Sequence, residues 1–415
     1  MKVQINKRVL INRINSGEKY LYIKNKSDFY PLFLKQEIIE KLIDIGYSGT
    51  DKIKAVSMLG EKQFSILYKL GILGSCDSEI QMPFYNFENE LLMLNHKSYE
   101  SRTPMLAKYE ITYACNYRCK HCYVNGIKGN KASTIDIKNT IEQIKKNNIP
   151  ELYITGGEPL MHPDIVEILQ FCEKIKMPVT VQSNAALINE EFVNSIRETN
   201  MIRFAISFHD ADENLFNEFV QTEGAFNMTL KGIRCLESAN IPFYLKVNVT
   251  SENEKNIKET IDYIKDKYSF KIFSQIFPQI ADKEDMSKYV NSSKTLEWLY
   301  ENNYIEFSKS KCSAGRLKLW IAPDGSVYPC EMIRECVGNI YSEKFETIWN
   351  GDGIKQYMDI EEKIYTEKCK QCNLKEYCNA CPAYLLYKNW SIKLDGFCEN
   401  AKIASNVSRK RDINN

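Results

Sequence analysis

The sequence lacks two features that would place the protein at a membrane or on nucleic acid. It has no apolar run long enough for a signal peptide or a membrane-spanning helix. Its 55 Lys and Arg and its 54 Asp and Glu nearly cancel, leaving a net charge of +1. Such a balance argues against a broad electrostatic footprint on nucleic acid or on an anionic membrane. We therefore expect a cytoplasmic protein with no nucleic acid and no membrane as partner.

What the sequence does have is cysteine, fourteen in 415 residues. Disulfides are not expected, because the cytosol keeps thiols reduced, and metal ligation is the better interpretation. Ten of the fourteen fall into spaced groups. Four stand apart and default to buried, inert thiols: Cys76, Cys172, Cys235 and Cys336.

The length and the hydrophobic periodicity predict an α/β protein of three domains. In residues 1–98, strands precede three amphipathic helices, which resembles a winged helix, and a turn-rich linker follows from about residue 75. In residues 99–300, six strand-like segments alternate with helices, which predicts a partial (β/α)6 TIM-like barrel. Those segments are 108–112, 152–155, 179–182, 203–207, 244–249 and 271–277. Residues 301–415 are cysteine-rich, and the last ten are expected to form a disordered tail.

A cysteine triplet directly follows the first predicted barrel strand, where the chemistry of such a barrel is located. Residues 115–122 read CNYRCKHC, a C-x3-C-x2-C spacing that supplies Cys115, Cys119 and Cys122. Three thiolates on one loop suit a 4Fe–4S cluster and leave one iron open to a small-molecule ligand. A zinc site is the alternative, but zinc usually takes four protein ligands.

This triplet at a strand end resembles the signature of the radical S-adenosylmethionine (radical SAM) superfamily. The resemblance implies that S-adenosylmethionine binds the open iron and is cleaved to a 5′-deoxyadenosyl radical. It also implies cofactor contacts from His121, which stands where the family has an aromatic residue beside the adenine.

Three further strand ends carry residues that are similar to the family's cofactor site. The second strand ends in a GGEP motif, in which Glu158 would pair with the cofactor's ammonium group. The third ends in a sequence similar to the family's ribose-contacting motif, and the fourth in a serine. The cofactor-binding residues implied are Gly156, Gly157, Glu158, Pro159, Ser183, Asn184 and Ser207. The family's arginine for the cofactor carboxylate is missing after Ser207; Asn248 or Lys246 could substitute or be ordinary polar strand residues, so the carboxylate partner stays open.

The C-terminal cysteines resemble the SPASM extension of radical SAM peptide maturases. The spacing C-x12-G-x4-C is followed by C-x2-C-x5-C-x2-C and a last cysteine, one residue shorter than usual in the final pair. A zinc ribbon is the alternative for the later motif. The resemblance implies two auxiliary clusters, so three 4Fe–4S clusters in all. It assigns one to Cys312, Cys330 and Cys381, and the other to Cys369, Cys372, Cys378 and Cys398. Either Cys336 or a substrate thiolate would complete the first.

The N-terminal unit resembles a PqqD-like recognition element, which holds a leader peptide as an added strand. DNA binding and simple docking are the alternatives for this unit.

Together these features predict a radical SAM oxidoreductase that modifies a ribosomally made precursor peptide, with electrons from a flavodoxin or ferredoxin. We expect thioether crosslinks like those of sactipeptides. The alternatives are carbon–carbon crosslinking, epimerisation or decarboxylation of the peptide, and formylglycine formation in a sulfatase. An iron–sulfur DNA-binding redox sensor is a more distant one.

Overall fold

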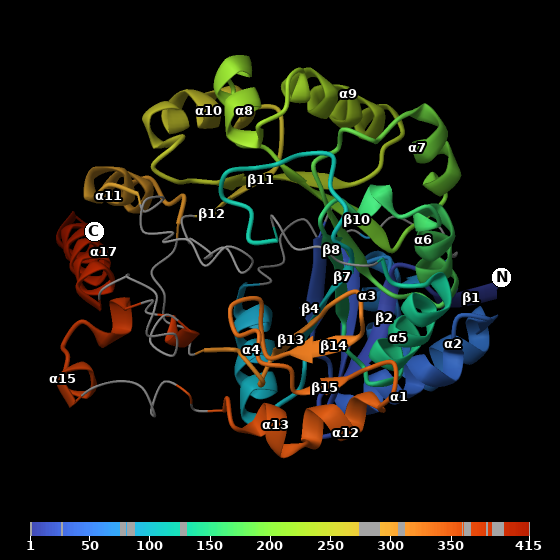
Figure 1. Ribbon diagram of the computed structural model, residues 1–415. Helices are drawn as coiled ribbons and strands as arrows, with labels where there is room; N and C mark the ends of the chain where they lie inside the picture. Colours follow the sequence, from blue (N-terminus) through green and yellow to red (C-terminus); the bar gives the residue numbers. More distant parts are fainter. Residues whose placement is uncertain are drawn as a thin grey trace.

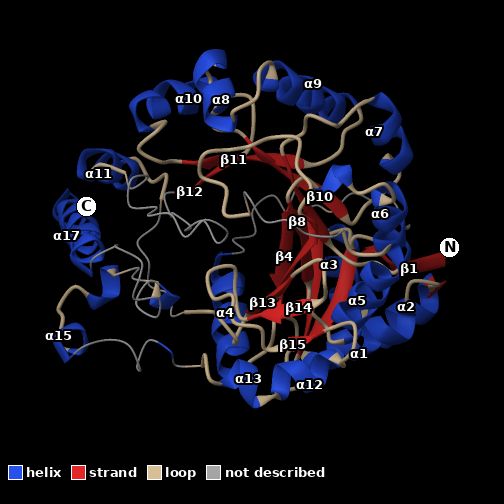
Figure 2. Cartoon of the chain, viewed as in Figure 1, coloured by secondary structure: helices blue, strands red, loops and turns tan. Residues whose placement is uncertain are grey.

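A curved sheet with helices along its outside forms the centre of the molecule (Figures 1 and 2). The computed structural model describes residues 2–25, 28–74, 80, 88–124, 131–273, 291–305, 312–358, 360, 367–378, 381–383 and 394–414. Every helix in these ranges is too short or too polar to span a bilayer. Cys76 and the end of the last predicted barrel strand, 274–277, lie outside the described residues.

The N-terminal unit contains the expected strands and three helices around its own apolar core. Its elements are β1 (Lys2–Ile5), β2 (Val9–Arg13), β3 (Lys19–Asn25), β4 (Asp28–Leu32), α1 (Gln36–Ile45), β5 (Thr50–Asp51), α2 (Lys52–Leu59), α3 (Glu61–Lys69) and β6 (Leu73–Gly74). They form two antiparallel sheets, ordered β5-β1-β6 and β2-β3-β4. Ile39 and Leu42 on α1 and Phe64 and Leu67 on α3 are buried, at the spacing that an amphipathic helix requires.

The middle of the chain forms the predicted partial barrel. Its elements are β7 (Leu106–Thr112), α5 (Thr134–Lys146), β8 (Glu151–Gly156), η1 (Pro159–Met161), α6 (Ile165–Lys174), β9 (Val179–Ser183), α7 (Glu190–Ile196), β10 (Ile202–Ser207), α8 (Glu213–Val220), α9 (Ala225–Ser238), β11 (Phe243–Asn248), η2 (Glu254–Asn256), α10 (Ile257–Ile264), β12 (Phe270–Phe273) and α11 (Ser293–Glu301). Strands β7 to β12 are parallel. Ser133, Asn189 and Asp212 cap the starts of α5, α7 and α8 through their side chains.

The C-terminal part extends the same sheet. Its elements are β13 (Lys318–Ile321), β14 (Ser326–Tyr328), β15 (Gly338–Asn339), α12 (Phe345–Asn350), α13 (Asp352–Lys355), α15 (Glu367–Lys370), η4 (Lys375–Tyr377) and α17 (Leu394–Asn414). Strand β13 pairs in parallel with β7, so the sheet order is β12-β11-β10-β9-β8-β7-β13-β14-β15. The auxiliary cysteine region is therefore joined to the barrel by strand pairing at the very strand that precedes the cysteine triplet.

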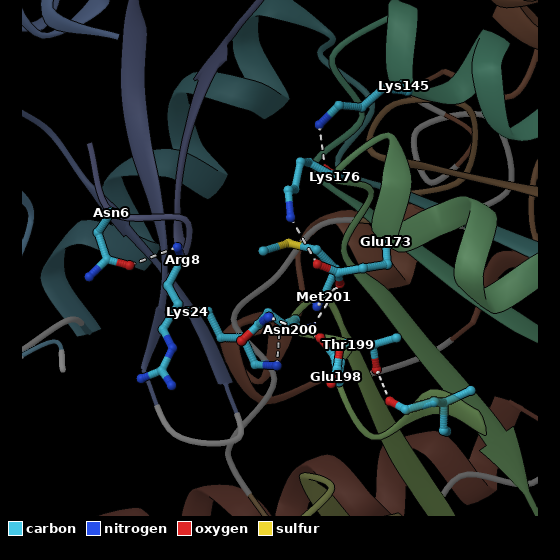
Figure 3. Close-up of polar contacts among 11 residues, drawn as sticks. Asn6, Arg8, Lys24, Lys145, Glu173, Lys176, Glu198, Thr199, Asn200 and Met201 are labelled. Atoms are coloured by element: carbon cyan, nitrogen blue, oxygen red, sulfur yellow. Dashed lines mark hydrogen bonds and ion pairs between the residues drawn. The ribbon is translucent and has the colours of Figure 1, made fainter. Parts of the chain in front are cut away.

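The N-terminal unit docks on the barrel end where the parallel strands begin (Figure 3). The Lys24 ammonium on β3 donates a hydrogen bond to the Asn200 carbonyl just before β10. Arg203 at the start of β10 forms a 2.6 Å ion pair with Asp28 on β4. The Glu173 carboxylate accepts a 2.7 Å hydrogen bond from the Asn200 amide and fixes the same turn. The described contacts of the N-terminal unit therefore lie at the barrel end opposite to the one where the strands finish.

Two segments differ from the sequence prediction. Part of the stretch predicted as a linker forms helix α4 (Glu88–Ser101), because Leu94 packs against aromatic residues of the N-terminal sheet. The predicted disordered tail continues helix α17, which packs along α11. Lys410 there forms ion pairs with Glu297 and Glu301, contacts that its local composition does not indicate.

Candidate functional site

The cysteine triplet lies on the loop that follows β7, as the sequence predicts. The amides of Arg118 and Lys120 donate hydrogen bonds to carbonyls at the end of α8 and fix the loop. The three thiols lie close enough to interact electrostatically with one another. Burial raises the pKa of Cys115 to about 12, so the thiol stays protonated unless a cation replaces the proton. Three such thiols around one space suit an iron cluster, which supplies that positive charge.

Glu158 occupies the centre of the cofactor residues predicted from the strand ends. Its carboxylate is buried and accepts hydrogen bonds from Ser183 Oγ (2.9 Å), the Asn184 amide (2.8 Å) and the Leu160 amide (3.1 Å). Burial raises the pKa of Glu158 to about 7, although these hydrogen bonds oppose the shift. Burying this carboxylate without a cation is costly, so the site is suited to an incoming ammonium group.

The two glycines of the GGEP motif bring the second strand end against the cysteine loop. A Cβ on Gly157 would lie 2.3 Å from the Ala114 carbonyl oxygen, and a Cβ on Gly156 would lie 2.1 Å from the Thr112 oxygen. Instead, the Gly157 amide donates a 2.8 Å hydrogen bond to the Thr112 carbonyl, and the Glu158 amide donates one of 2.8 Å to the Ala114 carbonyl. Only glycine permits this approach, which holds Glu158 beside the triplet.

His121 lies in an aromatic and polar corner of the site. Its ring centroid is 5.0 Å from that of His209 and 4.8 Å from that of Phe219. Its Nε2 lies 3.2 Å from Asn248 Nδ2. Burial lowers the pKa of His121 to about 4, so the imidazole is neutral at physiological pH.

One cavity of about 1010 Å³, including space open to solvent, brings the predicted cofactor residues together. Its lining includes Cys115, Cys119, His121, Cys122, Gly156, Gly157, Glu158, Ser183, Asn184 and Ser207. Pro159 is buried at the start of η1, next to this cavity lining. Five buried polar atoms on the lining have no hydrogen-bond partner among the described residues: His121 Nδ1, His209 Nδ1, Asn248 Oδ1, Trp320 Nε1 and Glu331 Oε2. Orphaned polar atoms around a cavity of this size fit a polar, nucleoside-sized cofactor such as S-adenosylmethionine.

The cavity contains several residues that the sequence did not indicate as site residues. They are Lys108, Tyr117, Tyr123, Thr155, Gln182, His209, Phe216, Val220, Trp320 and Glu331. Lys108 lies within strand β7, and Gln182 lies within β9 directly before Ser183. Polar residues inside otherwise buried parallel strands are the signal that would have identified them.

The first predicted auxiliary group is assembled around one lysine. Burial would lower the pKa of Lys318, but Glu331 and then Cys330, Cys312 and Cys381 raise it above its usual value. Cys312 and Cys381 pack with Cys330 in one apolar cluster. The structure therefore brings together the three cysteines that the resemblance assigns to the first auxiliary cluster.

The cysteines of the second predicted group lie on neighbouring elements. Cys369 is on α15, Cys372 and Cys378 flank η4, and Cys398 is on α17, which packs against η4. Within the described ranges, no group of three or more His, Cys, Asp or Glu is arranged to hold a single metal ion.

Three of the cysteines that stand apart can be compared with the expectation of buried thiols. Cys172 and Cys235 are buried, as expected. For Cys336 the expectation was wrong, because this thiol is exposed and donates a hydrogen bond to the Gly338 carbonyl at 3.3 Å. It lies in the extended segment before β15, where the strand edge keeps it at the surface.

Comparison with known proteins agrees with this geometry. Residues 109–264 match the radical SAM superfamily, and residues 312–382 match the iron-sulfur cluster-binding SPASM domain. The AdoMet-dependent heme synthase of Methanosarcina barkeri is 25% identical over 68% of this chain and 92% of its own length. The subtilosin biosynthesis protein AlbA of Bacillus subtilis is 26% identical over 68% of each chain. Streptococcus suis SuiB, solved with its precursor peptide SuiA, superposes with a TM-score of 0.66 at 19% identity, covering 94% of this chain and 98% of SuiB.

The fold and the two matched regions define a radical SAM enzyme. More particularly, the chain is a radical SAM/SPASM enzyme, which uses S-adenosylmethionine and the iron–sulfur clusters of both domains.

Proposed function

We propose that this enzyme modifies a ribosomally made precursor peptide and forms thioether bonds between cysteine sulfur and carbon. The observation that carries the proposal is the shared cavity. Its lining runs from the cysteine triplet to Trp320 and Glu331, and Glu331 directly follows Cys330 of the first auxiliary group. A peptide segment in this cavity would lie between the radical site and an auxiliary cluster.

In this proposal Cys115, Cys119 and Cys122 hold the first cluster, and Glu158, Ser183, Asn184, His121 and Ser207 bind the cofactor. When bound to that cluster, S-adenosylmethionine supplies a 5′-deoxyadenosyl radical, which abstracts hydrogen from carbon. The protein's own part is positioning: Glu158 orients the ammonium group, and Gly157 keeps the backbone close. Each thioether would remove two hydrogen atoms from the peptide.

Two auxiliary 4Fe–4S clusters complete the proposed set of three. Cys312, Cys330 and Cys381 would bind one, with Lys318 balancing its charge. Cys369, Cys372, Cys378 and Cys398 would bind the other. In the described residues, Cys336 contacts Gly338 and acts electrostatically on Tyr328, not on Cys312, Cys330 or Cys381. This favours a substrate thiolate as the fourth ligand of the first auxiliary cluster. A flavodoxin or ferredoxin would supply the electrons.

The N-terminal unit, within the proposed domain 1–98, would bind the leader of the precursor. The remaining boundaries proposed are 99–300 for the barrel and 301–415 for the SPASM domain. In the N-terminal unit, strands β2 and β4 are the edges of a small sheet, and a peptide can add to such an edge as a further strand. SuiB, whose structure contains its precursor peptide, aligns over 94% of this chain and therefore includes the N-terminal unit.

A second candidate is modification of a tetrapyrrole, because the AdoMet-dependent heme synthase aligns over 92% of its own length. That alignment covers 68% of this chain, so part of this chain has no counterpart in it. An N-terminal peptide-binding unit would account for the part of this chain that the heme synthase does not match. This favours a peptide over a tetrapyrrole as the substrate.

Co-expression tests the proposal. The short peptide encoded nearest to this gene is produced with the enzyme, purified without oxygen, and its intact mass is recorded before and after thiol alkylation. We expect a loss of two hydrogens per bond and an equal number of cysteines protected from alkylation. An unchanged mass with all thiols free would refute thioether formation. The Cys115→Ala variant is the control, because it should leave the peptide unmodified while the enzyme is still produced.

A further inference from the structure

The cavity lining carries two lysines from different strands, close enough for their charges to interact. Lys108 is in the middle of β7 and Lys246 in the middle of β11, and both line the cavity. Burial lowers the pKa of both lysines, and Lys108 lowers the pKa of Lys246 further because the two charges lie near each other. Within the described ranges, neither ammonium donates a hydrogen bond or forms an ion pair. Two half-buried like charges that lie near each other repel unless an anion lies between them.

Lys108 is held in place by aromatic rings rather than by a carboxylate. Strand pairing sets Lys108 directly between Trp320 on β13 and Tyr153 on β8. Its ammonium lies 4.7 Å from the Trp320 ring centroid and 5.3 Å from that of Tyr153. These cation–π contacts orient the charge while leaving its hydrogen-bond donors available.

Glu331 is the carboxylate of the cavity lining that acts on both lysines, and it already pairs with a third cation. Glu331 Oε2 lies 3.4 Å from Lys318 Nζ, and Lys318 also faces the three cysteines of the first auxiliary group. Glu158 lies at the ends of β8 and β9, where it is engaged by Ser183 and Asn184. Glu331 also acts on Lys108 and Lys246, but it is one carboxylate shared among three lysines, so an excess of positive charge is left at this place.

Trp320 adds a further unused donor at the same place. The residue is 3% exposed, and its indole Nε1 has no hydrogen-bond partner among the described residues. A buried N–H without a partner costs free energy unless a ligand accepts from it. Two ammonium groups and one indole N–H match the acceptor capacity of a carboxylate.

We propose that Lys108, Lys246 and Trp320 bind a carboxylate of the substrate, so that the peptide carries an acidic side chain at the position inserted into the barrel. This rests on the proposed function only in taking the substrate to be a peptide. Lys108 pairs with Trp320 on β13, the strand that leads to Cys330 of the SPASM domain. The site therefore selects the substrate rather than the cofactor.

The test uses labelled glutarate, a small aliphatic dicarboxylate, as the probe. Binding to the intact enzyme, with all clusters oxidised and S-adenosylmethionine saturating, is measured by equilibrium dialysis. We expect one glutarate per chain, no competition by glutaramide, and binding weakened about tenfold or more in Lys108→Met and in Lys246→Met. Lys145→Met is the matched control, because this buried lysine donates to the Lys176 carbonyl away from the cavity and should bind glutarate normally.

Each other result overturns the proposal. Equal glutarate binding in wild type and both cavity variants would show that the lysines do not form the site. Glutarate binding that appears only when S-adenosylmethionine is left out would show that the lysine pair holds the cofactor carboxylate. Iron content and thermal midpoint establish that the variants are folded. The glutarate measurement needs no peptide, so its failure would refute the carboxylate site alone. Failure of the co-expression experiment would instead refute the proposal that the substrate is a peptide.

Discussion

Arg334 and Glu110 form a two-pronged ion pair between the SPASM domain and the first barrel strand. Arg334 Nη1 lies 2.9 Å from Glu110 Oε2, and Nη2 lies 2.6 Å from Oε1, although the residues are 224 positions apart. Glu110 is fully buried and also accepts hydrogen bonds from Tyr113 and Tyr123, which flank the cysteine triplet. The pair therefore connects the loop of the first cluster with the segment that follows Cys330.

Removing Arg334 should destabilise the fold, because the Glu110 carboxylate would stay buried without its cation. We expect Arg334→Met to lower the free energy of unfolding by about 3–5 kcal/mol, because Glu110 would be left charged without a cation. Urea unfolding of the cluster-free protein measures the loss. The double variant Glu110→Gln/Arg334→Met should recover part of it, and Lys410→Met, at an exposed ion pair, should change little. Equal stability of wild type and Arg334→Met would contradict the assigned role.

The close approach at Gly157 predicts a second sensitive position. Gly157→Ala places a Cβ 2.3 Å from the Ala114 oxygen and should displace the cysteine loop. A displacement of this kind slows catalysis about a hundredfold, which we expect for formation of 5′-deoxyadenosine from S-adenosylmethionine. Gly224→Asn is the control: its φ of 68° suits asparagine, and a Cβ there meets nothing within 4 Å. Normal rates in Gly157→Ala would show that the two loops do not need this contact.

The raised pKa of Glu158, about 7, predicts how cofactor binding depends on pH. Only the ionised carboxylate attracts an ammonium group, and below pH 7 an increasing fraction of Glu158 is protonated. Affinity for S-adenosylmethionine should therefore fall as pH drops from 7.5 to 6, approaching about tenfold per unit at the acid end. Glu158→Gln should bind weakly and without this dependence. A wild-type affinity that is constant over the same range would refute the role of Glu158.

Iron content tests the proposed cluster ligands. Three 4Fe–4S clusters correspond to about twelve iron atoms per chain. Replacing Cys312 and Cys330 together by alanine should remove about four of them and leave the first cluster able to cleave S-adenosylmethionine. Cys336→Ala should retain the full iron content, because that thiol is exposed and engaged with Gly338. Loss of about four irons in Cys336→Ala would instead identify it as the missing ligand.

Sequence reasoning succeeded where the signal is local. The period of apolar residues located strands β7 to β12, and the strand ends placed Glu158, Ser183 and Asn184 at one rim, because parallel strands finish on the same side. It did not find the pairing of Trp320 with Lys108, which depends on β13 joining β7 after the whole barrel has been formed. Helix α17 was missed for a related reason, since its stability comes from packing on α11 rather than from its polar sequence.

The most direct measurement follows hydrogen from the substrate to the cofactor product. The reconstituted enzyme is incubated without oxygen with S-adenosylmethionine, a reductant and the neighbouring precursor peptide deuterated at its carbon-bound positions. We predict 5′-deoxyadenosine that contains one deuterium for each modification event, formed faster with the peptide than without it. Unlabelled 5′-deoxyadenosine at the same rate with and without the peptide would contradict hydrogen abstraction from the peptide and favour another substrate.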